Sequence, residues 1–482
     1  MSNPALQVYG GDEISAVIID PGSYTTNIGY SGTDCPQVIL PSCYGHYKNE
    51  EQGKSKVFNE QSIGIPRPDY EIKRILENGS VVDWDAAQEQ WSWAIHDELK
   101  FESTKGIPAF LSEPIWNTDA NRKKSLEVLL ESMDFEACYL APTATCTSFA
   151  MGRPTCLVVD IGHDVSSVCP VVDGMTLSKS STRNFLAGKF LNALVEKKLE
   201  PREVIPLFKV AKRRPEFIAK HFDYAIDHSL NDFANSTGFF QEFKETLFQV
   251  APINLEKFKP ELENAAKRSI EAPWGEHIVF DSYTRYGFAE QLFKPRKEDL
   301  PQGWPESIDG VVETWHNDYV PLKRTKPGTN SKDKEGTSES TPAPDDVNGS
   351  VSSDLPNENG KRPVEDTPEE TKNPIAGLAD LVYGAIMATD VDLRATLAHN
   401  VVVTGGTSSI TGLTDRLMTE LNKKLPALKF RILTTGHPRE RQYQSWLGGS
   451  ILSSLGTFHQ LWVGKQEYAE VGADRLLKDR FR

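Results

Sequence analysis

Two short stretches of the chain have the residues of a phosphate-binding turn. In the first, the apolar run 16–19 ends in Asp20, and Gly22 and Ser23 lead into a second strand-like run, 25–30. Backbone N–H groups and hydroxyls in such a turn can surround a phosphate, while an aspartate at the strand end can face a metal ion. One such hairpin is a weak signal, because many tight turns contain these residue types.

The same pattern occurs again in the middle of the chain. The apolar run 156–159 ends in Asp160, Gly162 follows two residues later, and a hydroxyl-rich strand begins at about Val165. Two such turns that face each other would hold a polyphosphate from both sides.

A third turn adds a helix end to the two hairpins. The apolar strand 400–403 runs into Gly405 and Gly406, and a helical pattern follows at 413–425. Adjacent glycines allow a ligand to approach the backbone closely, and the positive N-terminal end of a helix suits an anion or a nucleotide.

Apolar periodicity predicts the elements that position these turns. Helical spacing occurs at 84–99, 121–133, 185–199, 375–387 and 413–425. Strand-like runs occur at 107–111, 137–140, 278–280, 283–288, 400–403 and 430–433. The order of these elements, which restarts at about residue 156, predicts an α/β protein with a mixed sheet flanked by helices.

The composition is that of a globular protein with an acidic balance. The 482 residues are 38% hydrophobic and 25% charged, and the net charge is −15. This charge argues against direct DNA binding as the main activity, although it would favour basic partners such as histones. The six cysteines show no metal-ligand spacing, and no apolar run approaches the ~18 residues of a membrane-spanning helix. We therefore expect a soluble, intracellular protein without a membrane partner.

The stretch 323–373 differs from the rest of the chain. It has no aromatic residue and one leucine, and it is rich in Pro, Ser, Thr, Gly, Asp and Glu. Such a segment cannot bury enough apolar surface to offset the loss of chain entropy, so we predict that it is disordered.

The C-terminal stretch 440–462 resembles actin nearly position for position, and shorter matches occur at 112–114, 121–122 and 390–394. The two hairpins and the Thr-Gly-Gly-Thr turn resemble those of the actin, sugar-kinase and heat-shock ATPase superfamily. The resemblance covers the chain except about 296–373, and its acidic insertion and altered loops look like those of the nuclear actin-related proteins. It implies an actin-like α/β fold with two similar halves, each a mixed sheet flanked by helices, and a nucleotide cleft between them.

The family fold implies a division of the chain. The first half is 1–155 with 453–482, including a small loop-bearing subdomain at about 42–80; the second half is 156–295 with 374–452, and 296–373 is an insertion.

The resemblance also implies a site for ATP or ADP, with Mg²⁺ or Ca²⁺. The implied nucleotide contacts match the family's two phosphate turns and its nucleoside pocket: Gly22, Ser23, Tyr24, Thr25, Gly162, His163, Asp164, Val165, Gly188, Lys244, Glu245, Gly406, Thr407, Ser409, Ile410 and Gln442. Asp20 and Asp160 match the carboxylates that hold the metal ion through water.

Three departures from actin surround the place where a water would attack the nucleotide. Asn27 stands where actin has a phosphate-binding lysine, Thr143 replaces a glutamine that positions the water, and Ser167 replaces a histidine that helps to activate it. Water activation is hard to rebuild from a threonine and a serine. We therefore expect an ATP binder with weak or absent hydrolysis rather than an enzyme. The alternative is an active ATPase switch that changes partner affinity.

The nuclear class implies the location and the partners. We expect a nuclear scaffold subunit of chromatin-remodelling and histone-acetyltransferase complexes, which pairs with actin on a long helical segment of a large subunit and helps to engage histones or nucleosomes. The groove that actin uses for partner helices is matched by Phe149, Gly152, Ile451, Leu452, Leu455, Thr457 and Leu461. Several of these residues could instead belong to the core.

Assembly into homo-filaments is not expected. The stretch that matches the subunit-docking loop of actin, 45–56, is polar and charged, and the insertion adds volume at the longitudinal contacts. A filament-forming cytoskeletal protein is a weaker alternative. A sugar kinase is the weakest, because no carboxylate suggests itself as a substrate base.

Overall fold

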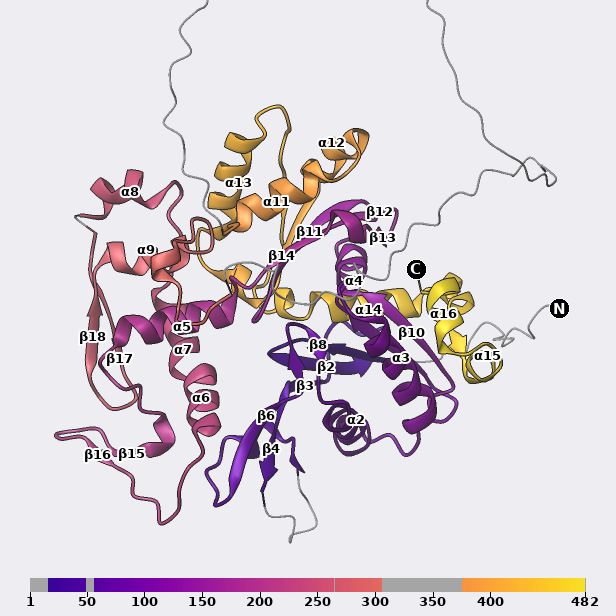
Figure 1. Cartoon of the computed structure of the whole chain (residues 1–482), viewed down its shortest axis with the longest axis horizontal. Helices are drawn as coiled ribbons and strands as arrows, with labels where there is room; N and C mark the ends of the chain where they lie inside the picture. Colours follow the sequence, from indigo (N-terminus) through magenta and orange to yellow (C-terminus); the bar gives the residue numbers. More distant parts are fainter. Residues whose placement is uncertain (1–15, 49–55, 264, 306–374, 482) are drawn as a thin grey trace, which may run out of the picture. The chain divides into compact units, whose positions relative to one another are not determined.

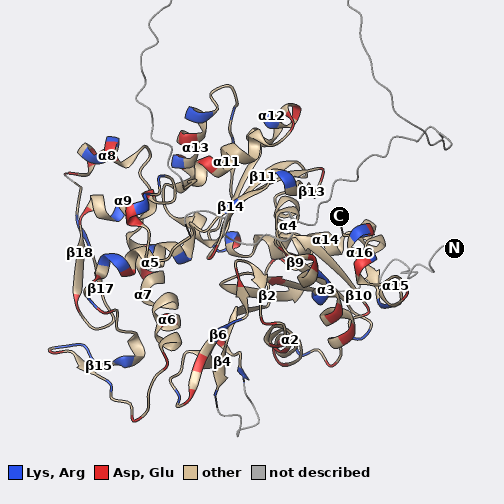
Figure 2. Ribbon diagram, in the orientation of Figure 1, with Lys and Arg blue, Asp and Glu red and all other residues tan. Residues whose placement is uncertain are grey.

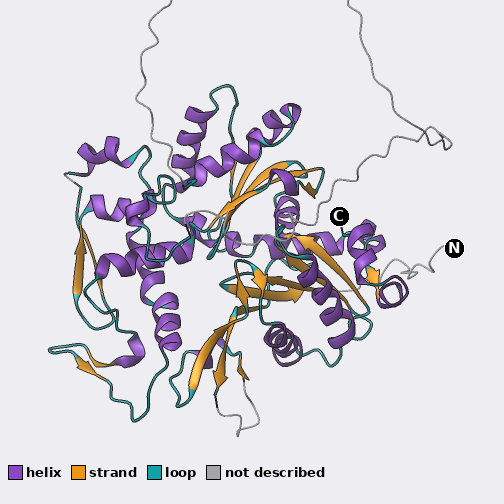
Figure 3. Cartoon of the chain, in the orientation of Figure 1, coloured by secondary structure: helices purple, strands orange, loops and turns teal. Residues whose placement is uncertain are grey.

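The computed structural model describes residues 16–48, 56–263, 265–305 and 375–481. The segment 323–373 and the tip of the polar loop, 49–55, lie outside the described residues. The described part contains two six-stranded sheets flanked by helices, which confirms the α/β class (Figure 1, Figure 3). None of its helices is long and apolar enough to cross a membrane.

The first sheet holds the first hairpin. In order across the sheet, its strands are β21 (Val463–Gly464), β10 (Ala137–Pro142), β9 (Pro108–Glu113), β1 (Val17–Pro21), β2 (Thr25–Tyr30) and β3 (Val38–Pro41). β1 runs antiparallel to β2 and parallel to β9. β1 is buried along its whole length, which explains why its sequence is continuously apolar up to Asp20.

The second sheet repeats this arrangement around the second hairpin. In order, its strands are β13 (Met175–Thr176), β12 (Ser166–Val172), β11 (Cys156–Ile161), β19 (Val401–Thr404) and β20 (Ile432–Leu433), with β14 (Thr182–Asn184) paired to β12. β11 runs antiparallel to β12 and parallel to β19, as β1 does to β2 and β9. The repeat extends to the register, because Asp20 lies opposite Asn27 and Asp160 lies opposite Ser167.

Helices and short strands surround the two sheets. The helices are α1 (Glu60–Ile63), α2 (Trp84–Trp93), α3 (Asp119–Glu127), α4 (Thr143–Ala150), α5 (Gly188–Leu199), α6 (His228–Thr237), α7 (Phe239–Leu247), α8 (Leu255–Leu262), α9 (Ser282–Glu290), α11 (Leu378–Met387), α12 (Val391–His399), α13 (Leu413–Lys424), α14 (Gln444–Ser454), α15 (Lys465–Val471) and α16 (Ala473–Asp479). The short strands are β4 (Cys43–Tyr47), β5 (Lys56–Val57), β6 (Tyr70–Arg74), β7 (Leu76–Glu77), β8 (Ser80–Val81), β15 (Val210–Lys212), β16 (Ile218–Ala219), β17 (Arg268–Glu271) and β18 (His277–Phe280).

Most of the predicted elements form, with ends shifted by a few residues. The strand predicted at 283–288 is wrong, because this segment lies in α9. Its Tyr, Thr and Phe residues favour a strand. A helix forms instead because the side chain of Asp281 accepts a hydrogen bond from the backbone N–H of Thr284 at 2.8 Å, and Phe288 and Ala289 are then buried in the core.

Each sheet has its own hydrophobic core, and two helices join them. Trp91 of α2 is buried in the core of the first sheet, and Phe243 of α7 in that of the second. α14 contacts β1 and β9, α4 contacts β11 and β12, and the two helices pack against each other. Their backbones approach so closely that a Cβ on Gly448 would lie 1.7 Å from the carbonyl oxygen of Cys146. The two hairpins are therefore held on one framework.

Candidate functional site

The two hairpin turns line one cavity of about 580 Å³. This volume is typical of a small-molecule site. The sequence-predicted residues on its wall are Asp20, Gly22, Ser23, Tyr24, Thr25, Asp160, Gly162, His163, Asp164, Val165, Lys244, Glu245, Gly406, Thr407, Ser409, Ile410 and Gln442. Residues that are up to 422 positions apart in the chain, Asp20 and Gln442 among them, are thus brought together around one space.

Gly188 lies behind the second turn instead of on the cavity wall. Its backbone N–H donates to the carbonyl of Gly162 at 3.1 Å, and the hydroxyl of Thr407 donates to the same carbonyl at 2.8 Å. A Cβ on Gly188 would lie 2.9 Å from Oγ1 of Thr407. Gly188 therefore supports the turn rather than forming part of the wall.

The two turns have the same backbone closure. The N–H of Gly22 donates to the carbonyl of Thr25, and the N–H of Gly162 donates to the carbonyl of Val165, each at 3.0 Å. The duplicated sequence pattern therefore produces a duplicated local structure.

The turn between β7 and β8 connects the two hairpin turns. The backbone N–H of Gly79 donates to Oγ of Ser23 at 2.9 Å, and the N–H of Asn78 donates to the carboxylate of Asp164 at 3.1 Å. The guanidinium of Arg74 lies 3.6 Å from the same carboxylate. The carboxylate of Asp164 is thus occupied by Asn78 and Arg74. Its backbone N–H, in contrast, is suited to donating to a phosphate.

Asp20 and Asp160 place two carboxylates on the cavity wall. Asp20 is buried and accepts hydrogen bonds from Oγ of Ser445 at 2.7 Å, from Nδ2 of Asn27 at 3.2 Å and from the hydroxyl of Ser112. Burial raises the pKa of Asp20, and these hydrogen bonds oppose the rise. Burial, together with the nearby charge of Asp20, raises the pKa of Asp160 to about 6.

The two carboxylates do not form a complete metal site. The described residues contain no group of three His, Cys, Asp or Glu side chains that could hold a metal ion. A divalent cation near Asp20 and Asp160 would therefore take most of its oxygen ligands from water and from a bound phosphate, which is the usual arrangement for Mg²⁺. Such a cation would also offset the repulsion from Asp20, which adds to the effect of burial on the pKa of Asp160.

Lys244 and His163 differ in charge although both line the cavity. Burial lowers the pKa of Lys244 to about 8, and an anionic ligand would raise it again by favouring the charged form. Burial lowers the pKa of His163 well below 6.5, and its ring centroid lies 4.9 Å from that of Tyr24. Lys244 can therefore attract a phosphate, whereas the neutral imidazole of His163 adds no charge.

The three departures from actin lie around the two carboxylates. Asn27 and Ser167 occupy equivalent register positions, opposite Asp20 and Asp160, and Thr143 is the first residue of α4. All three line the cavity. Amide and hydroxyl side chains do not accept a proton from water at neutral pH. These positions can bind a ligand, but they supply no general base.

Comparison with known sequences identifies the family. A family model described as "Actin" matches residues 11–481. The chain belongs to the actin family. It is 70% identical to a protein of Eremothecium gossypii and 68% identical to one of Saccharomyces cerevisiae, with 100% of both chains covered in each case. A relative from Schizosaccharomyces pombe is 34% identical, with 97% of both chains covered. All three relatives are named Actin-related protein 4.

Actin-family members have an ATP-binding fold, and the cavity fits a nucleotide. Gly405 has φ of +87°, and a Cβ there would lie 2.4 Å from Oδ1 of Asp160 and 2.3 Å from the carbonyl oxygen of Ile161. Only a glycine lets the chain pass this close to the carboxylate. The donors of the two turns, the two carboxylates and Lys244 are the groups that a polyphosphate with a divalent cation requires.

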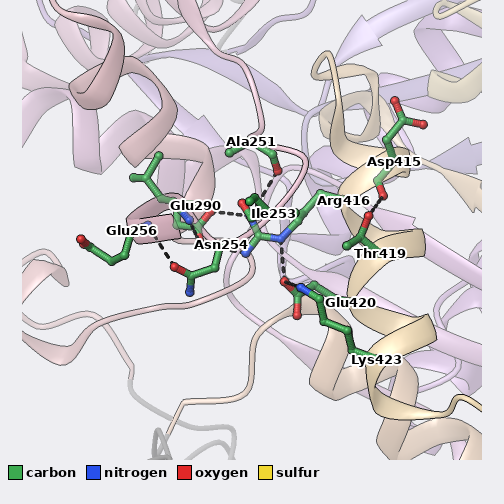
Figure 4. Close-up of polar contacts among 11 residues, drawn as sticks. Ala251, Ile253, Asn254, Glu256, Glu290, Asp415, Arg416, Thr419, Glu420 and Lys423 are labelled. Atoms are coloured by element: carbon green, nitrogen blue, oxygen red, sulfur yellow. Dashed lines mark hydrogen bonds and ion pairs between the residues drawn. The ribbon is translucent and has the colours of Figure 1, made fainter. Parts of the chain in front are cut away.

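A buried ion network fixes α13, which follows the cavity-lining turn at 405–411 (Figure 4). Arg416 is fully buried, and its guanidinium donates to both carboxylate oxygens of Glu290, at 2.6 and 2.8 Å, and to Glu420 at 2.8 Å. It also donates to the carbonyls of Ala251, at 3.2 Å, and Ile253, at 2.7 Å. Arg416 thereby joins α13 to the C-terminal end of α9.

Sequence reasoning missed several residues of the cavity wall: Trp116, Gln241, Phe248, Arg439 and Ser445. Trp116 follows the actin-like stretch 112–114, and Ser445 lies inside 440–462, so the resemblance could have indicated both. The other three reach the cavity through tertiary packing, and no local pattern marks them.

Proposed function

We propose that this protein is a nucleotide-stabilised scaffold subunit of nuclear chromatin-remodelling and histone-acetyltransferase complexes, with ATP as a structural ligand. One observation carries the proposal: the positions facing the two cavity carboxylates hold Asn27 and Ser167, and Thr143 lines the same space. A site that keeps its phosphate turns but has no base at these three positions is suited to holding ATP rather than hydrolysing it.

The chain's own residues have distinct parts in holding the nucleotide. The turns closed by the N–H groups of Gly22 and Gly162 would form the two phosphate clamps, and Asp20 and Asp160 would orient the waters of a Mg²⁺ or Ca²⁺ ion. Lys244 lies where it can neutralise part of the ligand's charge. When bound, ATP would supply the anionic phosphate oxygens for these groups to hold. Because such a ligand binds the folded state and not the unfolded chain, it stabilises the fold.

Part of the predicted partner groove offers apolar surface. Ile451, Leu455 and Leu461 are 37%, 42% and 45% exposed, whereas Leu452 is buried and packs with Phe458. Three exposed aliphatic side chains at the end of α14 and just beyond it suit the apolar face of an amphipathic helix. This surface supports a helical segment of a large subunit as the partner. We propose that actin lies beside the protein on the same helix. The net charge of −15 supports engagement of basic histones.

The partner proposal can be tested by disrupting the groove. The tagged full chain purified from nuclear extract should bring down actin and a remodeller or acetyltransferase subunit, both identified by mass spectrometry. Ile451→Asp with Leu455→Asp should abolish their recovery, because a charge replaces the buried apolar contact. Val391→Asp is the matched control, since Val391 is 71% exposed on α12. Retention of both partners by the groove variant would contradict the proposal.

The role of ATP can be tested separately. ATP and a non-hydrolysable analogue should support assembly with these partners equally well. Assembly that requires hydrolysable ATP would instead identify an ATPase switch.

A further inference from the structure

A basic and apolar ribbon projects from the acidic chain at residues 207–222, which include β15 and β16. Every residue from Ala211 to His221 is exposed. The segment carries five Lys or Arg side chains and one acidic side chain, against a net charge of −15 for the whole chain. In Figure 2 the ribbon at β15 is partly blue, the colour of Lys and Arg. Leu207, Phe217 and Ile218 are also 58%, 40% and 51% exposed.

Contacts with the β17–β18 hairpin hold the tip of the ribbon. Nη2 of Arg214 lies 3.0 Å from Nε2 of His277 and 3.2 Å from a carboxylate oxygen of Glu271. Gly275 has φ of +91°, and a Cβ there would lie 2.9 Å from the carbonyl oxygen of Arg213. The tip is therefore a fixed surface, because the backbones of the two hairpins are in close contact.

The ribbon also has open backbone edges. Within the described residues, β15 and β16 pair only with each other, through Val210–Ala219 and Lys212–Ile218. An unpaired edge is a template for another extended segment. Lysine on such an edge opposes pairing with a second copy of the same basic ribbon, but it attracts an acidic segment.

We propose that the ribbon 207–222 binds an extended acidic peptide segment that carries apolar side chains. The backbone of the peptide would pair with an edge of the ribbon, its carboxylates would face Lys212 and Arg213, and its apolar side chains would cover Ile218. Nucleic acid fits less well. Single strands bind through stacking on aromatic platforms, whereas two of the three large exposed apolar residues here are aliphatic.

Binding of two fluorescent peptides to the full-length protein tests the proposal. One peptide of about twelve residues alternates Asp with Leu, and the other has Ser in place of Leu. The first should bind more tightly than the second, because only it covers the apolar side chains. Lys212→Glu with Arg213→Glu should weaken binding of the first peptide at least tenfold, and Ile218→Ser should remove most of its advantage over the second.

The matched control is Lys257→Glu with Lys429→Glu, which makes the same charge change at two exposed lysines outside the ribbon. The affinity of this control for the first peptide should stay within twofold of that of the unmodified protein. Thermal melts should show that all variants fold. Equal affinities of the ribbon variant and the control for the first peptide would overturn the proposal. The proposal would also be overturned if a single-stranded oligonucleotide bound the unmodified protein more tightly than the first peptide does, and if the ribbon variant no longer bound this oligonucleotide.

Discussion

Replacing Asp160 with Asn should stabilise the ligand-free protein while weakening its response to nucleotide. The ordinary pKa of the carboxyl is 3.8, and in the fold it is raised to about 6. The folded state therefore binds this proton more tightly than the unfolded chain does. The stability that comes from the protonated form is complete below pH 3.8 and is lost as the pH rises through about 6.

The magnitude follows from this difference in pKa. A rise in pKa from 3.8 to about 6 corresponds to a loss of about 3 kcal/mol of folding free energy at neutral pH. The partial solvent exposure of Asp160 reduces this expected loss to about 1–3 kcal/mol. The amide of Asn carries no charge at any of these pH values. Asp160→Asn should therefore be more stable than the unmodified protein by this amount at pH 7.5, and the difference should shrink as the pH falls towards 4.

Urea denaturation of nucleotide-free protein measures this difference. In a second series of urea melts, saturating ATP and Mg²⁺ should stabilise the unmodified protein strongly and Asp160→Asn only weakly. The reason is that the variant loses a carboxylate that would orient the cation's waters. Asp97→Asn, at an exposed site, is the control, and its free energy of unfolding should equal that of the unmodified protein in both series. If ligand-free Asp160→Asn were less stable than the unmodified protein at pH 7.5, the carboxylate would have a structural role and the reasoning would be refuted.

Three further changes probe the site and the ion network that fixes α13 beside it. Arg416→Met should lower the free energy of unfolding by about 3–5 kcal/mol in urea melts, because it leaves buried carboxylates unpaired, whereas exposed Lys423→Met should have little effect. Gly405→Ala should abolish ATP binding in calorimetry, because its Cβ would clash with the carbonyl of Ile161; normal affinity would mean that the turn can move. ATP affinity should fall as the pH rises through about 8, where Lys244 loses its charge, and Lys244→Met should lack this dependence.

Local sequence patterns were sufficient to predict the two hairpins. A run of buried apolar residues, an aspartate and a glycine turn are all near neighbours in the chain, so their pattern reflects a local structure. The segment 283–288 shows the limit of such reasoning. Its residue types favour a strand, but the side chain of Asp281 accepts a hydrogen bond from the N–H of Thr284 and starts a helix.

Contacts between distant residues could not be predicted in the same way. Nothing in the helical pattern at 413–425 marks Arg416 as buried, because its partner Glu290 is 126 residues away in the chain. The resemblance placed Gly188 among the ligand contacts, but the structure places it behind the turn at Gly162. Positions of this kind depend on how the two sheets pack, and a single sequence does not report that packing.

Whether the cavity holds ATP without hydrolysing it can be measured directly. The purified protein is loaded with ATP and Mg²⁺, incubated for several hours and denatured, and the released nucleotide is identified by mass spectrometry, with actin treated in parallel. With Asn27, Thr143 and Ser167 around the two carboxylates, we predict that the nucleotide is recovered as ATP. Recovery as ADP, with phosphate released as fast as from actin, would contradict a holding role for the site.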